Sequence, residues 1–167
     1  WFSDQDYEKY GNQIVCNPAI KTKEDRDAVW QGLLNGNIDV IATDHAPHTW
    51  EEKSDIYPKC PSGVPLIQHS LLMMLEKIKE GKMRLEMMVD KMSHKVAELF
   101  EIKDRGYIRE GYFADLVLIN PNKNYQVTKE NIAYKCGWSP FEGYNFSHNI
   151  DFTFVNGILM QKFGEIQ

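Results

Sequence analysis

The apolar and polar positions in the first third of the chain predict a strand, a helix and a second strand. Residues 14–16 form a short apolar run that stops at Asn17-Pro18, where proline removes a backbone donor, so we predict a buried strand. A helix is expected from Thr22, which has an acidic residue three positions later, to Asn35-Gly36. Residues 38–42 are again apolar and typical of a strand. This order is that of a βαβ unit, which implies a parallel sheet and an α/β fold.

The middle of the chain is expected to be a long loop followed by helices. Residues 49–64 are polar and broken by prolines, and this length favours a functional loop over a minimal connection. Apolar residues at helical spacing predict a helix over residues 65–79, and two shorter helices over 85–89 and 93–100. Ser93 is the expected N-cap of the last one.

The pattern changes after Phe100, where glycines and short β-type runs replace the helices. Residues 114–119 predict a strand, and residues 152–160 predict a hairpin whose Asn156-Gly157 turn suits type I′ geometry. We therefore predict two domains, residues 1–105 and a β segment over residues 106–167.

Composition and charge narrow the function classes. The chain has 167 residues, 43% hydrophobic and 26% charged, which is ordinary for a globular protein. A complete (β/α)8 barrel needs roughly 250 residues, so a self-contained barrel is excluded, although part of one is not. The net charge of -5 comes without a basic cluster, so nucleic acid is not expected as a partner. There is no apolar run long enough to cross a bilayer, so we expect no membrane partner and a cytoplasmic location.

The cysteines and the first residue add two expectations. Cys16, Cys60 and Cys136 are far apart and form no CxxC pair, so neither a disulfide framework nor a thiolate zinc site is predicted. The chain begins at Trp1 without an initiator methionine, and we expect that an N-terminal part is missing.

The densest candidate chemistry is Asp44, His45 and His48 at the end of the second predicted strand. In α/β folds the working residues follow the C-terminal ends of the strands, and Asn17 takes that position on the neighbouring predicted strand. A carboxylate held there can bind a metal or move a proton. The cluster is equally compatible with an ordinary turn, and alone it has too few ligands for a closed zinc site.

Asn17 and the pair Ser62-Gly63 have both a functional and a structural interpretation, whereas His69 has a structural one only. The Asn17 amide offers two donors and an acceptor to a polar ligand, but it also suits a turn before proline. Ser62-Gly63 lies in the long loop, where a glycine lets backbone N–H groups approach an anion, although a plain turn is the more common reason for it. His69 lies on an apolar helix and is expected to be a packed core histidine.

The segment from Ala42 to Lys53, with the sequence ATDHAPHTWEEK, resembles the second signature of the dihydroorotases, cyclic amidohydrolases of pyrimidine biosynthesis. The match extends to Lys53, five residues after the second histidine, whereas hydantoinases and allantoinases usually lack the Ala-Pro-His part. Asn17-Pro18 is similar to the family's segment after the seventh barrel strand, although the continuation differs. The glycine-rich C-terminal part resembles strands of a small β-sandwich beside the barrel.

The resemblance implies a fold, a reaction and a set of roles. The fold would be the C-terminal part of a (β/α)8 barrel plus β-sandwich strands, and the intact enzyme would interconvert N-carbamoyl-L-aspartate and dihydroorotate at two zinc ions. Asp44 would be a metal ligand and the general base that carries a proton to the leaving nitrogen. Asn17, His48 and the Ser62-Gly63 backbone would bind the substrate, with His48 and the loop suited to its carboxylate.

The same resemblance implies that most zinc ligands lie outside this chain, so the chain alone is expected to be inactive. We expect it to need the missing N-terminal part of the same protein, and to form a homo-oligomer. A hydantoinase or allantoinase activity stays open within this fold. A non-catalytic homologue with a structural or assembly role stays open as a different class.

Overall fold

The computed structural model describes all of residues 1–167, and these separate into two compact units. The first unit contains Trp1–Ile38, Thr43–Ser70 and Val127–Tyr144, and the second contains Asp39–Ala42, Leu71–Gln126 and Asn145–Gln167. The division at residues 105 and 106 stays a prediction.

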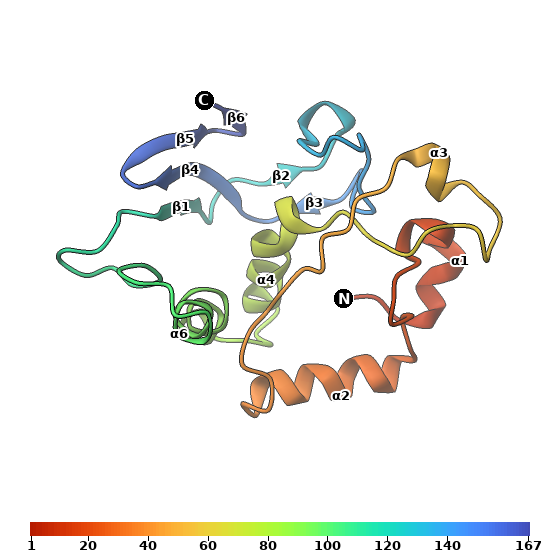
Figure 1. The fold of residues 1–167 in the computed structure, drawn as a ribbon, viewed down its shortest axis with the longest axis horizontal. Coiled ribbons are helices and arrows are strands. Elements are labelled where there is room, and N and C mark those ends of the chain that lie inside the picture. The colour runs from red at the N-terminus through yellow and green to blue at the C-terminus, as the bar shows by residue number, and fades with distance from the viewer. The chain divides into compact units, whose positions relative to one another are not determined.

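The longest helix of the first unit is α2 (Lys23–Leu34), the orange helix in Figure 1. Its N-cap is Thr22, whose Oγ1 accepts a hydrogen bond from the backbone N–H of Asp25, while the Asp25 carboxylate accepts one from the backbone N–H of Thr22. This capping box satisfies two N–H groups that have no partner within the helix. The helix ends at Asn35, and Gly36 follows with a φ of 82°. The predicted helix is confirmed.

The remaining helices of the first unit are short. They are the 3-10 turns η1 (Asp4–Asp6), η2 (Gly11–Ile14), η3 (Ile67–His69) and η5 (Lys129–Asn131), with the α-helices α1 (Tyr7–Tyr10) and α3 (Trp50–Lys53). An aromatic core joins distant segments, since Phe141, 1% exposed, contacts the rings of Trp1, Phe2 and Tyr144. The N-terminal segment is thereby packed against residues more than a hundred positions later.

The two strands predicted over residues 14–16 and 38–42 are wrong. Ile14 ends the turn η2, and neither run belongs to a strand. An extended segment counts as a strand only when a neighbouring segment completes its ladder of backbone hydrogen bonds. Here the Val15 carbonyl accepts from the Gly63 N–H, and the Ile41 N–H donates to the Lys91 carbonyl, so these backbone groups are satisfied by isolated bonds.

The helices of the second unit follow one another closely along the chain. Helix α4 (Ser70–Lys79) is confirmed, although it begins later than predicted because residues 67–69 form a 3-10 turn. Helices α5 (Leu85–Val89) and α6 (Lys95–Leu99) are joined by a π-helical turn (Asp90–His94). Ser93 lies inside that turn, so its prediction as an N-cap is wrong, because the backbone there is already helical.

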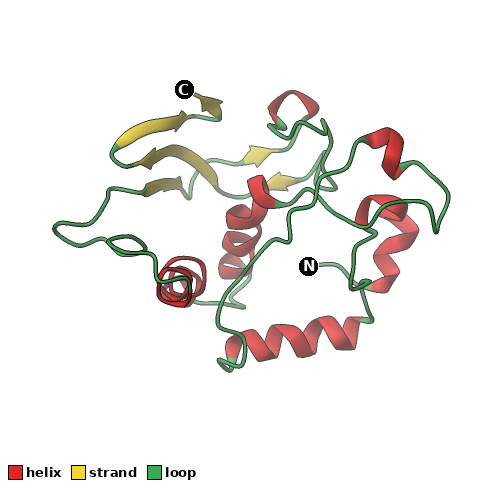
Figure 2. Cartoon of the chain, in the orientation of Figure 1, coloured by secondary structure: helices red, strands yellow, loops and turns green.

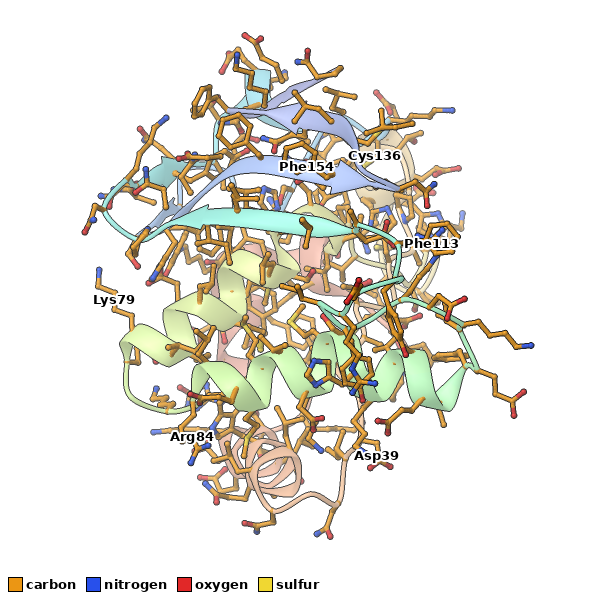
Figure 3. All side chains as sticks on the ribbon, turned by 90° about the vertical axis from the view of Figure 1, so that its left-hand side faces the viewer. Asp39, Lys79, Arg84, Phe113, Cys136 and Phe154 are labelled. Atoms are coloured by element: carbon orange, nitrogen blue, oxygen red, sulfur yellow. The ribbon has the colours of Figure 1, made fainter.

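The sheet of the second unit is antiparallel, with the strand order β1-β4-β5-β6. Its strands are β1 (Leu116–Asn120), β4 (Asn149–Val155), β5 (Ile158–Lys162) and β6 (Glu165–Ile166), and β2 (Tyr125–Gln126) pairs with β3 (Asn145–Phe146) in a second sheet. The β4–β5 hairpin turns at Asn156-Gly157, where both φ angles are positive, as a type I′ turn requires. Figure 3 shows Phe154 on this sheet and Phe113 in the segment that leads into β1. The predicted hairpin and strand are confirmed.

The chain is thus a mixture of helices and small antiparallel sheets. Parallel pairing is limited to one isolated bridge between His45 and Val64. No helix has both the length and the apolar character needed to cross a membrane.

Candidate functional site: a loop mouth around Asp44

Three loop segments of the first unit meet at one place, which we call the mouth: residues 15–17, 44–48 and 61–66. The Gly63 N–H donates to the Val15 carbonyl at 2.9 Å, and the Ala46 N–H donates to the Val64 carbonyl at 3.4 Å. The segment 61–66 is therefore bonded to both of the others. Figure 2 draws the chain on both sides of α3, which connects two of these segments, as loops. All five predicted site residues lie on these segments.

Asp44 is exposed at the mouth and has an unusual backbone. Its φ is 45°, in the left-handed region that residues other than glycine rarely adopt. Such conformations cost energy and concentrate at functional sites, because the surrounding structure must hold them. Burial raises the pKa of the Cys16 thiol, and the negative charge of Asp44 adds to this rise. Asp44 therefore lies within electrostatic range of the segment that carries Asn17, which is itself exposed.

His48 is tied into the mouth through both of its ring nitrogens. Its Nε2 lies 3.2 Å from the Ser62 carbonyl oxygen, and its Nδ1 lies 3.5 Å from a Glu52 carboxylate oxygen. A carbonyl oxygen only accepts, so Nε2 carries the proton. The His48 carbonyl accepts from the Trp138 indole at 2.8 Å, which fixes the backbone as well. A substrate group that binds this imidazole would have to replace one of these partners.

Ser62 and Gly63 differ in their exposure and in their backbone contacts. Gly63 is buried with a φ of 151°, and a Cβ at this position would stand 2.3 Å from the Ala46 carbonyl oxygen and 3.0 Å from the His48 ring. Its N–H bonds to Val15, and its carbonyl accepts from Lys53. Gly63 therefore shapes the mouth by a close backbone approach, and Ser62 is the exposed member of the pair.

His45 has a role that the sequence did not indicate. Its Nδ1 accepts from the backbone N–H groups of Leu66 at 3.1 Å and Ile67 at 3.4 Å. A nitrogen that accepts cannot carry a proton, so the imidazole is neutral with its hydrogen on Nε2. His45 thus holds the end of the segment 61–66 beside Asp44.

Lys53 is the second residue whose structural role the sequence did not indicate. It ends helix α3, is 0% exposed, and donates from Nζ to three carbonyl oxygens of the mouth. The sequence did offer a signal for α3, because Thr49 and Glu52 form a capping box in the structure and have the spacing of one. The hydrogen-bond partners of Lys53 are distant from it along the chain, so no local sequence pattern predicts them.

His69 is confirmed as a packed core histidine. It is 0% exposed, and its Nδ1 lies 3.4 Å from the Tyr134 hydroxyl and 3.3 Å from the Ser139 hydroxyl. Burial lowers the pKa of His69 to about 4, so the ring is neutral near pH 7.

The residues of this chain do not assemble a metal centre. No group of three His, Cys, Asp or Glu side chains among residues 1–167 is arranged to hold a metal ion. An exposed carboxylate such as Asp44 can contribute one oxygen ligand, which is fewer than a zinc site needs.

A shallow groove of the same unit lies elsewhere. It is lined by aromatic and polar residues that include Tyr10, Trp50 and Trp138, and by none of the five predicted site residues. The five predicted site residues therefore lie outside this groove.

Residues 4–160 match the model of the amidohydrolase family. The chain belongs to the amidohydrolase family. It is 38% identical over 149 residues to a dihydroorotase of Endomicrobium trichonymphae, covering 89% of this chain and 35% of that protein. It is 34% identical over 156 residues to a dihydroorotase of Clostridioides difficile, covering 93% and 36%. The resemblance to dihydroorotases is confirmed, and this amidohydrolase chain spans about a third of the length of these curated relatives.

Solved amidohydrolase structures share the fold. An L-hydantoinase (dihydropyrimidinase) from Arthrobacter aurescens superposes with a TM-score of 0.92 at 28% identity, over 99% of this chain and 38% of that one. A dihydropyrimidinase from Brevibacillus agri superposes with a TM-score of 0.87 at 26% identity, again over 99% and 38%.

Proposed function

We propose that this chain carries the proton-transfer and substrate-binding part of a cyclic amidase that interconverts N-carbamoyl-L-aspartate and dihydroorotate. The observation that carries the proposal is the mouth, where an exposed Asp44 with a strained backbone stands in the same bonded loop cluster as Asn17 and Ser62. Relatives at 34% to 38% identity that are named dihydroorotases support this substrate.

The chemistry fits the groups present. Hydrolysis of a ring amide adds water to the carbonyl carbon and breaks the C–N bond, which leaves a carboxylate, a protonated ureido nitrogen and one proton that is released to solvent. The Asp44 carboxylate takes a proton from the attacking water and delivers it to the leaving nitrogen, so it ends the cycle as it began. The Asn17 amide has two donors and an acceptor for the ring amide groups.

Zinc stays a prediction for the parent protein, by which we mean the full-length product that contains residues 1–167. The resemblance implies two zinc ions, but Asp44 is the one residue of this chain that it assigns as a ligand, and no three-ligand group exists in this chain. We therefore assign no step of the reaction to zinc.

Part of a (β/α)8 barrel, followed by β-sandwich strands, is the architecture we propose for residues 1–105 and 106–167. The high TM-scores to amidohydrolase structures support it, although the chain itself pairs no parallel ladder. An N-terminal part that supplies the remaining barrel strands, and assembly into a homo-oligomer, belong to the same proposal.

A hydantoinase-type activity is the second candidate, because the structural neighbours at TM-scores of 0.92 and 0.87 bear that name or the name dihydropyrimidinase. Dihydroorotate carries a carboxylate that hydantoin and dihydropyrimidine rings lack. The resemblance to dihydroorotases assigns His48 and the Ser62-Gly63 loop to that carboxylate, and this favours the carboxylated ring. A non-catalytic homologue with a role in assembly is the remaining alternative.

The test is a substrate panel on the parent protein. Purified protein is assayed for opening of dihydroorotate, hydantoin, dihydrouracil and allantoin, and for closure of N-carbamoyl-L-aspartate. The proposal predicts the highest kcat/KM for dihydroorotate. A preference for an uncharged ring would favour the hydantoinase reading, and no activity on any ring would favour the non-catalytic one.

A further inference from the structure

Lys53 is a buried cation without a carboxylate partner. Its side chain is 0% exposed, and none of the ion pairs of the chain includes it. A charge removed from water is unfavourable unless polar groups replace its hydration shell.

The hydration shell of Lys53 is replaced by three backbone carbonyls. Nζ lies 3.0 Å from the Val15 oxygen, 2.9 Å from the Pro61 oxygen and 3.0 Å from the Gly63 oxygen. An ammonium group has three hydrogens and no acceptor, so each hydrogen has one partner. Bonds from a charged donor are stronger than neutral ones, and in a site shielded from water they are stronger still.

The three carbonyls belong to residues that flank the predicted substrate-binding residues. Val15 stands two positions before Asn17, and Pro61 and Gly63 stand on either side of Ser62. The Val15 oxygen also accepts from the Gly63 N–H, and the Cys60 thiol donates to the Lys53 carbonyl at 3.5 Å. The ammonium thus joins the two segments that carry Asn17 and Ser62, neither of which has a strand ladder to hold it.

The short helix α3 positions this cation. Its N-cap Thr49 directly follows His48, and the capping box with Glu52 fixes the first turn. Glu52 also faces the His48 ring. Lys53 therefore connects the segment 44–48, which carries Asp44, to both of the other segments of the mouth.

We propose that Lys53 is the positioning residue of the substrate site, its ammonium group clamping the Asn17 and Ser62 segments onto the Asp44 segment. The proposal rests on the proposed function, because the residues it positions are those we assign to substrate binding. Lys53 touches no reacting atom. Its loss would displace Asn17 and Ser62 more than Asp44, so it acts on substrate affinity more than on turnover.

The experiment compares Lys53→Met with wild type in the parent protein. Methionine keeps the length and apolar stem of lysine but provides no donor. We expect KM for dihydroorotate to rise at least tenfold, while kcat changes less than threefold. The matched control is Lys91→Met, which replaces a lysine that is 6% exposed and lies outside the mouth. This control is expected to lower the melting temperature without changing KM.

A second variant tests the chemistry of the clamp. Lys53→Ala leaves a cavity that propylammonium fits, and adding this amine should lower the raised KM in a saturable way. Propanol, which has the same shape without the charge, should not. An unchanged KM in Lys53→Met, with activity falling only in proportion to the folded fraction, would overturn the proposal.

If the variants do not fold, a measurement on the wild-type protein still tests the proposal. Three bonds from a buried ammonium should make the Lys53 Nζ hydrogens exchange slowly with water, giving a sharp side-chain signal in nitrogen-15 NMR. Fast exchange of these hydrogens would refute the clamp. Slow exchange in a protein inactive on every ring would leave the clamp in place and refute the proposed function instead.

Discussion

The mouth of the first unit and the four-stranded sheet of the second are built in opposite ways. The sheet β1-β4-β5-β6 is held by repeated backbone pairing, in which successive residues along each strand make equivalent interactions with the neighbouring strand. The mouth has one isolated β-bridge, and single side chains hold its loops: Lys53 on three carbonyls, His45 on two N–H groups, and Trp138 on the His48 carbonyl.

This difference predicts how each region responds to change. A sheet loses one interaction among many when a residue is replaced, so stability falls a little and geometry stays. In the mouth one side chain fixes several segments, so a single replacement moves the groups that we propose bind substrate. The mouth should therefore show large effects on activity, and the sheet should show small effects on stability alone.

The largest effect is expected for Gly63→Ala in the mouth. The added Cβ would stand 2.3 Å from the Ala46 carbonyl oxygen and 2.9 Å from the Ala46 Cβ, so the backbone must shift. We expect a loss of roughly 2–4 kcal/mol in the free energy of unfolding, from the clash and the positive φ together. Denaturant unfolding and KM for dihydroorotate, measured on the parent protein, give both effects.

Gly36→Ala is the matched control for that change. Gly36 has a φ of 82° but nothing within 4 Å of the added Cβ, so only the backbone cost of about 1 kcal/mol remains. If Gly63→Ala were as stable and as active as Gly36→Ala, the conclusion that Gly63 is closely packed against Ala46 in the mouth would be wrong.

The next largest effect is a pH dependence of the free energy of unfolding, and it arises from His69 in the first unit. The pKa of His69 is lowered by burial to about 4, against about 6.5 for an exposed histidine in the unfolded chain. The unfolded state therefore binds more protons between these values, and the contribution of His69 to stability is complete above pH 6.5 and is lost as the pH falls through about 4. The loss is at most about 3 kcal/mol.

His69→Gln isolates this contribution from that of the carboxylates. The variant should be less stable at pH 7, but its unfolding free energy should fall less steeply than that of wild type between pH 6.5 and 4. Equal slopes for the two proteins in urea titrations over this range would show that His69 is not buried as a neutral ring.

The smallest effect is expected for Gly157→Ala in the sheet. Gly157 has a φ of 77° in the hairpin turn, and the added Cβ would make an ordinary 3.9 Å contact with Ala114. The loss should be about 1 kcal/mol of unfolding free energy from the backbone alone, with KM unchanged. If Gly157→Ala changed KM more than Gly63→Ala does, the sheet would affect substrate binding more than the mouth, and the comparison between the two regions would be reversed.

The sequence predicts the elements whose cause is local. The Thr22 capping box and the apolar spacing of residues 23–34 are sufficient for α2, and Asn156-Gly157 is sufficient for the hairpin. Residues 14–16 and 38–42 were predicted as strands from their apolar character, but a strand needs a partner, which a local pattern does not contain. Helix α3 was missed because four residues are too few to show a period, although its capping box was readable.

The site divides in the same way. The segments of Asn17, Asp44 and Ser62 could be singled out because two follow apolar runs and one lies in a long loop, and the structure brings these segments together. The bonds that hold them could not be predicted, since Lys53 and Val15 are 38 positions apart and their hydrogen bond depends on the fold. The left-handed backbone of Asp44 is likewise not apparent from the local sequence.

The most direct test of the central claim is the rate of Asp44→Asn in the parent protein. The claim is that Asp44 moves the proton in ring opening, and asparagine keeps its shape but cannot take a proton. General acid–base catalysis contributes about 10² to 10⁴ in rate, so kcat for dihydroorotate should fall at least 100-fold. Asp39→Asn, an exposed carboxylate five residues earlier, should leave kcat unchanged. A kcat for Asp44→Asn within threefold of wild type would contradict the account.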